Sequence, residues 1–102
     1  MVEDVGTKAL ALRMISVYDK MFSQKAYHES STNQMVISGE DVAQEFKSSG
    51  LFDSHLSDIW QEVNQTGSSF LTREQFILAC LLVYEHANNM TVEKEAALVE
   101  YL

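Results

Sequence analysis

The chain has 102 residues, with no proline, only four glycines and a single cysteine. A fold of many short strands needs frequent tight turns, so the scarcity of turn residues favours helices with short connections. A single cysteine excludes a disulfide framework and fits a reducing compartment. This residue, Cys80, lies in an apolar run, which is typical of a small core side chain. The longest apolar run, residues 76–84, is too short to span a bilayer.

Basic residues are also few. The chain has seven Lys and Arg residues and fifteen Asp and Glu residues, which gives a formal net charge of −8. The basic residues are scattered and form no stripe, so nucleic acid and anionic lipid headgroups would be repelled by most of the surface. A neutral or basic peptide remains an allowed partner.

The groups that carry catalysis are missing as well. The sequence has no Ser/His/Asp set, phosphate-binding loop or carboxylate pair, so we expect no enzymatic activity. His28, His55 and His86 lack metal-ligand spacing among themselves and with Cys80, so we expect no metal site there.

What the chain does contain is helical periodicity. Apolar residues recur at helical spacing from Thr7 to about Lys25, which predicts a long first helix. The polar stretch 26–34 predicts a loop, and residues 35–37 a short extended segment. Ser38 is expected to cap a second helix that Gly50 ends.

The second half repeats this plan. A stripe of Leu56, Ile59, Trp60 and Val63 predicts a third helix over residues 53–63. A loop follows, then Thr72 and Gln75 form a capping box for a fourth helix that is apolar almost all round. A last short helix is expected over residues 91–102.

This order predicts an all-α fold built from a pair of EF-hand-like helix-loop-helix units. Residues 69–71 are expected to pair with residues 35–37 in a short antiparallel β-ribbon between the loops. The chain is predicted to be one domain over residues 1–102, with its core over about 9–86 and the C-terminal helix over about 91–102.

The second loop, however, lacks calcium ligands. Counted from Asn64 as position 1, positions 3, 5, 6 and 12 are Thr66, Ser68, Ser69 and Gln75, and none of these residues carries a carboxylate. The first loop contains only Glu29 as an acid. We therefore expect no cofactor and no calcium binding at cellular concentrations.

A more specific pattern resembles the EH domain, a paired EF-hand module of endocytic and membrane-traffic adaptors. It covers residues 9–86 and is carried by the following residues: Ile37-Ser38-Gly39, Ser49, Leu51, Leu56, Ile59-Trp60, Gly67, Leu71 and Phe76. A bare EF-hand would not require the tryptophan.

The resemblance implies that the two EF-hand-like units pack back to back. It also implies a pocket between the second and third helices that binds Asn-Pro-Phe peptides. Trp60 would form its floor or wall and meet the ligand phenylalanine, and Leu56 and Phe46 would complete its apolar lining. Val42 and Ser57 would lie at the rim. A tryptophan at helical spacing is, however, also typical of an ordinary core, and Phe46 stands where the family mostly has a smaller leucine.

The implied function is a non-enzymatic protein–protein interaction module. It would recruit Asn-Pro-Phe-bearing partners in endocytosis, membrane traffic or related phosphoinositide and autophagy scaffolds. It would be cytoplasmic and reach membranes through its partners or a parent protein. Two alternatives stay open. One is an EH-like fold that has lost the Asn-Pro-Phe pocket and binds a partner through another surface, such as the longer first loop. The other is a calcium-responsive EF-hand switch.

Overall fold

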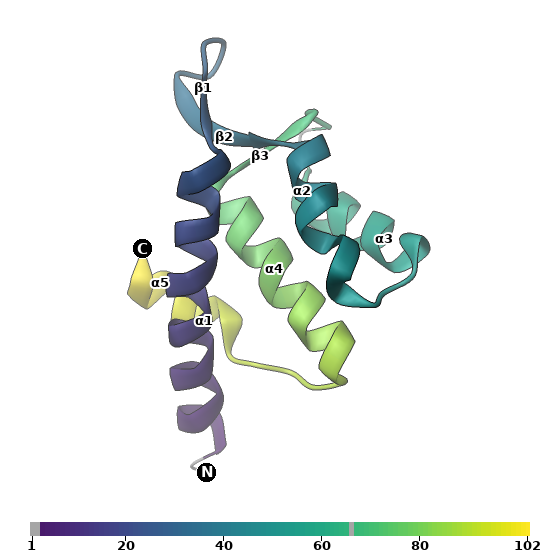
Figure 1. The fold of residues 1–102 in the computed structure, drawn as a ribbon. Helices are drawn as coiled ribbons and strands as arrows, with labels where there is room; N and C mark the ends of the chain where they lie inside the picture. The colour runs from purple at the N-terminus through teal and green to yellow at the C-terminus, as the bar shows by residue number, and fades with distance from the viewer. Residues whose placement is uncertain (1–2, 66) are drawn as a thin grey trace.

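The computed structural model describes residues 3–65 and 67–102 as two helix–strand–helix units with one extra helix (Figure 1). Its elements in chain order are α1 (Glu3–Lys25), β1 (Tyr27–Glu29), β2 (Gln34–Ser38), α2 (Gly39–Phe46), the 3-10 helix η1 (Lys47–Ser49), α3 (Asp53–Val63), β3 (Phe70–Thr72), α4 (Arg73–Asn88) and α5 (Lys94–Tyr101). The first helix begins at Glu3, four residues before the predicted start.

Strands β2 and β3 join the two units. They pair antiparallel, with Val36 opposite Thr72, Ile37 opposite Leu71 and Ser38 opposite Phe70. Ile37 and Leu71 are fully buried, so the ribbon also contributes to the core. The predicted pairing of residues 35–37 with 69–71 is confirmed to within one residue, and so is the predicted class of two EF-hand-like units.

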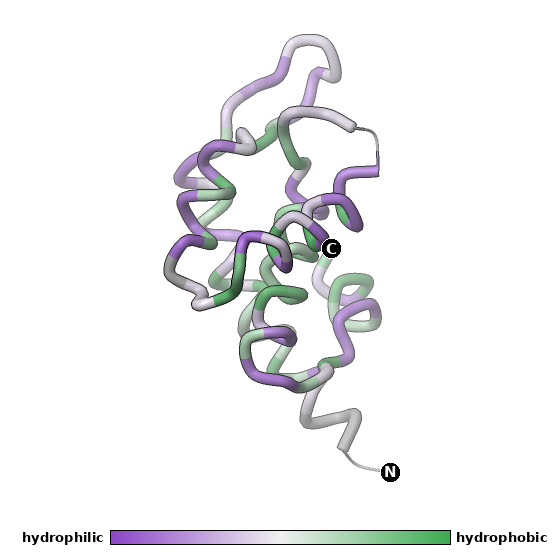
Figure 2. The backbone as a smooth tube through the Cα atoms, turned by 90° about the vertical axis from the view of Figure 1, so that its right-hand side faces the viewer, coloured by the Kyte–Doolittle hydropathy of each residue, from purple (hydrophilic) through white to green (hydrophobic). Residues whose placement is uncertain are grey.

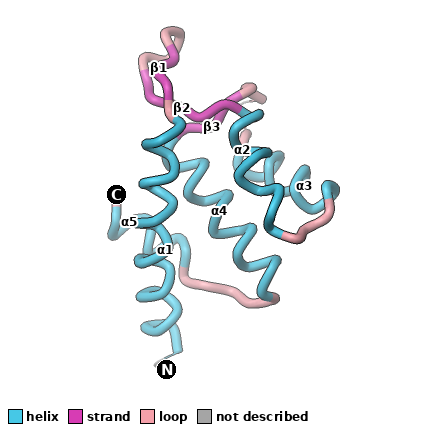
Figure 3. The backbone as a smooth tube through the Cα atoms, viewed as in Figure 1, coloured by secondary structure: helices cyan, strands magenta, loops and turns pink. Residues whose placement is uncertain are grey.

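The prediction of a loop over residues 26–34 is wrong for Tyr27–Glu29, which form β1. This strand pairs with β2 and makes the ribbon a three-stranded sheet in the order β1-β2-β3 (Figure 3). The chain reverses direction between β1 and β2 in a tight turn. In this turn the Glu29 carboxylate accepts the backbone N–H of Thr32 at 3.0 Å, and Asn33 adopts a positive φ of 55°. The resulting hairpin is largely hydrophilic (Figure 2).

The helix starts follow the predicted caps. The Ser38 hydroxyl accepts the backbone N–H of Asp41 at 3.1 Å, and Thr72 and Gln75 form both hydrogen bonds of a capping box. Gly50 closes the 3-10 extension after α2 with a φ of 85°, a conformation that favours glycine.

Helix α5 is shorter than the predicted segment 91–102 because the chain before it is held in another conformation. The buried Glu85 carboxylate accepts the backbone N–H of Val92 at 2.8 Å and binds Lys94 Nζ at 3.1 Å. Helix α5 then packs against α1 and α4. The Tyr101 hydroxyl donates to Asp19, which also binds Arg73 through both carboxylate oxygens.

Phe76 lies at the centre of the larger core cluster. Its ring stacks on Phe46 of α2 with centroids 6.3 Å apart and packs at a tilt against Phe22 of α1 at 6.1 Å. One fully buried side chain therefore connects α1, α2 and α4. A second cluster around Ile77 and Leu81 joins α4 to α1 and α5. Within residues 3–65 and 67–102, no helix is long and apolar enough to cross a membrane.

Replacing Phe76 by alanine should lower the free energy of unfolding by about 3–5 kcal/mol, because it leaves a cavity where three helices meet. Urea denaturation measures the change. Phe52→Ala is the matched control, since Phe52 is 75% exposed and should change stability by no more than about 0.5 kcal/mol. Equal losses in the two variants would contradict the central role of Phe76.

Candidate functional site

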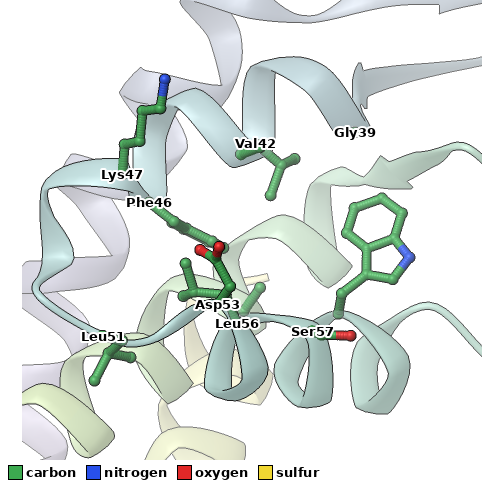
Figure 4. A pocket seen from close by; sticks show the side chains of 11 residues that line it. Gly39, Val42, Phe46, Lys47, Leu51, Asp53, Leu56 and Ser57 are labelled. Carbon is green, nitrogen blue, oxygen red and sulfur yellow. The ribbon is translucent and has the colours of Figure 1, made fainter.

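A cavity of about 360 Å³ lies between α2 and α3, with α4 beneath it (Figure 4). All five residues proposed from the sequence line it: Val42, Phe46, Leu56, Ser57 and Trp60. They come from two helices that are separated along the chain by η1 and a short loop. The fold therefore brings the whole candidate set to one place.

The same cavity is also lined by residues that are not predicted from the sequence: Gly39, Ala43, Lys47, Leu51, Asp53 and Ala79. Helical spacing could have found four of them. Gly39 and Ala43 share the α2 face of Val42 and Phe46, and Lys47 continues that spacing at the start of η1. Asp53 lies one turn before Leu56 on α3. Leu51 comes from a loop and Ala79 from α4, so no local period points to either.

Burial separates the five residues into two groups. Val42 is only 3% exposed, so it forms an inner wall, and its predicted place at the rim is wrong. Phe46 is 8% exposed because its ring stacks on Phe76 and only partly faces the cavity. Leu56 and Trp60 are partly buried against the core, and Ser57 is exposed, as expected for a rim position.

Trp60 lies against the start of α2. A Cβ atom placed on Gly39 would come within 3.2 Å of Trp60 Cη2 and within 3.2 Å of the Ser69 carbonyl oxygen. The Gly39 N–H also donates to that carbonyl at 2.9 Å. The absence of a side chain at Gly39 therefore lets the indole and the end of the second loop approach the α2 backbone.

The chemistry of the cavity is that of a binding site for apolar groups. Its walls are mostly aliphatic and aromatic, with exposed Lys47 and Asp53 supplying one charge of each sign. Cys80 lies outside the lining, and burial raises the pKa of its thiol, so it stays protonated at neutral pH. In the described part of the chain, no three His, Cys, Asp or Glu side chains are placed to hold a metal ion.

Polar side chains of the second loop, between α3 and α4, form hydrogen bonds with the backbone of the same loop. The Asn64 amide donates to the Ser68 carbonyl and accepts the Ser68 N–H at 3.2 Å. The Gln75 side chain accepts the Thr72 N–H at 2.9 Å as part of the capping box. Thr66, counted above as position 3 of an ion-binding loop, lies outside the described residues. Of the loop positions that would hold an ion, the described ones are Asn64, Ser68, Ser69 and Gln75. None of these four residues carries a carboxylate, and hydrogen bonds engage Asn64, Ser68 and Gln75 within the protein.

The chain matches a known protein family. A family model for the EH domain matches residues 14–100, nearly the whole chain, and so extends the resemblance past residue 86 into α5. The curated proteins and the solved structures give no match. EH domains are modules for protein–protein interaction and are not enzymes. Because the match covers residues 14–100, which is most of the chain and includes every residue that lines the cavity between α2 and α3, the chain belongs to the EH domain family.

Proposed function

We propose that this EH domain binds short Asn-Pro-Phe peptides in the cavity between α2 and α3. The observation that supports the proposal most directly is the meeting of Phe46, Leu56 and Trp60 around one open apolar cavity of about 360 Å³. That volume lies at the small end of the range for ligand pockets, which suits one bulky side chain in a tight turn better than an extended segment.

The physical basis is the burial of one benzyl ring. The partly exposed Trp60 offers a flat apolar wall, and an aromatic pair adds about 0.5–1.5 kcal/mol beyond its buried area. A three-residue turn buries little other surface, so we expect dissociation constants of about 10 µM to 1 mM. Stable recruitment then requires partners that carry several motifs.

The biological role proposed is that of a cytoplasmic adaptor. It would recruit proteins bearing Asn-Pro-Phe motifs to endocytic, membrane-traffic or related phosphoinositide and autophagy scaffolds, and contact membranes only through those partners or a parent protein. The net charge of −8 supports this, because it disfavours direct binding to anionic lipid.

We also propose that the domain works without calcium. A bidentate carboxylate at the last loop position normally supplies much of the affinity for the ion, and Gln75 is neutral and engaged with the Thr72 backbone. Asn64 is likewise hydrogen-bonded to Ser68. Binding calcium would break these bonds without supplying the missing negative charge.

Trp60→Ala should raise the dissociation constant of an Asn-Pro-Phe octapeptide by about 30-fold, equivalent to about 2 kcal/mol. NMR titration measures it, with the wild-type shifts expected at Phe46, Leu56 and Trp60. Phe52→Ala removes an exposed aromatic outside the cavity and should leave affinity unchanged.

An Asn-Pro-Ala peptide should not bind, and circular dichroism must show that both variants are folded. If the octapeptide shifts residues outside the cavity or none at all, the proposal fails. The alternative of an EH fold that binds through another surface, such as the β1–β2 hairpin, would then be favoured.

Gly39→Ala should lower the affinity for the same peptide about fivefold, because the added methyl group displaces the Trp60 indole. Gly50→Ala is the matched control: nothing lies within 4 Å of its Cβ position, but its φ of 85° is strained for alanine. That control should lose about 1 kcal/mol of stability and keep its peptide affinity. Unchanged affinity in Gly39→Ala would show that the indole position does not control binding.

Calorimetric titration with calcium up to about 1 mM, the weak end of EF-hand affinities, should give no binding heat, and the amide spectrum should not change. Restoring a carboxylate with Gln75→Glu tests the reason given, since it should produce measurable, weak binding. Saturable calcium binding by the unmodified chain would instead favour the calcium-responsive switch.

A further inference from the structure

A second apolar hollow lies where α3, α4 and α5 meet. We call it the α5 groove. Its volume is about 500 Å³, and its apolar lining consists of Val63, Leu78, Leu98, Val99 and Leu102. It shares no lining residue with the cavity between α2 and α3. The two hollows are therefore separate surfaces of the domain.

The groove exists because α5 has two apolar sides. Ala97 is fully buried, and the Tyr101 hydroxyl bonds Asp19 of α1, so these residues face the domain. Leu98, Val99 and Leu102 recur at spacings of one, three and four residues and lie along the groove. Val99 is 82% exposed and Leu102 is 45% exposed, so internal packing leaves much of this side uncovered.

The charges around the groove have one sign. Glu62 of α3, Glu74 of α4 and Glu95 of α5 line it, and its lining contains no basic residue. The four ion pairs found among the described residues involve none of these glutamates. The cavity between α2 and α3 differs, because Lys47 and Asp53 balance there.

We propose that the α5 groove is a docking surface for an amphipathic helix of a partner protein that carries lysine or arginine. Leucine-like side chains of the helix fill the groove between Leu78 and Val99, and its cations meet Glu62, Glu74 and Glu95. Charge complementarity selects this occupant. A second copy of the chain brings a net charge of −8 and the same three glutamates to the contact, and an anionic membrane is repelled in the same way.

This proposal is independent of peptide binding between α2 and α3. Since the two surfaces share no lining residue, both can be occupied at once. A variant that changes the groove should keep the affinity for an Asn-Pro-Phe peptide, which makes failure of one proposal distinguishable from failure of the other.

The test uses a capped 14-residue peptide with leucine at helical spacing on one face and lysine elsewhere. NMR titration of the full chain at low ionic strength should shift the amides of Leu78, Glu95, Leu98 and Val99. A peptide with glutamate in place of lysine should not bind. Analytical ultracentrifugation of the chain alone should show a monomer.

Two triple variants with the same net charge separate specific docking from general attraction. The first variant should lower the affinity for the lysine peptide about tenfold, and it combines Glu62→Gln, Glu74→Gln and Glu95→Gln. The control combines Glu40→Gln, Asp58→Asn and Glu93→Gln, all exposed acids outside the groove lining, and should weaken binding by less than about twofold.

The apolar contact is tested by Val99→Ser, which alters a residue that is mostly exposed and so should not disturb folding. It should lower the affinity for the lysine peptide about fivefold and leave the affinity for the Asn-Pro-Phe peptide unchanged. Equal weakening by the two triple variants, shifts spread over acids outside the groove, or a dimer that buries Val99 would each overturn the proposal.

Discussion

The packing of three phenylalanine rings at Phe76 fixes the geometry on which the candidate binding site depends. Phe46 stacks on Phe76 at an interplanar angle of 7°, so α2 is held on α4 by an aromatic contact in the core. Ala79 lies one turn after Phe76 on α4 and has too small a side chain to fill the space between α2 and α3. The same helix therefore anchors α2 with a large residue and leaves a cavity above a small one.

The loops of this EF-hand-like pair are braced by hydrogen bonds within the protein. Asn64 closes the second loop on Ser68, the Thr72 capping box begins α4, and Gly39 binds the Ser69 carbonyl. These contacts fix α2 relative to the second loop, and Trp60 packs beside them. None of these contacts involves a bound ion, so hydrogen bonds within the protein hold the described part of this loop.

Local sequence signals predicted the helices, the caps and the β2–β3 pairing because each depends on nearby residues. The β1 strand was missed because its stability comes from the Glu29 and Asn33 turn, which looks like an ordinary polar loop in sequence. The rim position that the resemblance implies for Val42 is wrong because a match by position gives the place of a residue along the helix but not its depth, which tertiary packing decides. Leu51 and Ala79 join the cavity only through tertiary packing. The α5 groove needs three elements from separate parts of the chain, so no local pattern could reveal it.

The distribution of charge would give the two proposed binding surfaces different selectivity. At the cavity between α2 and α3 the charges of Lys47 and Asp53 offset each other, so discrimination among peptides would come from the shape of the apolar walls and from the turn that the peptide adopts. The α5 groove is shallower, and its described lining contains three glutamates and no basic residue, so charge would contribute more of the discrimination in the proposed docking. Affinity at the groove should then fall with added salt more steeply than affinity at the cavity, because screening acts on exposed charges and barely on a buried ring.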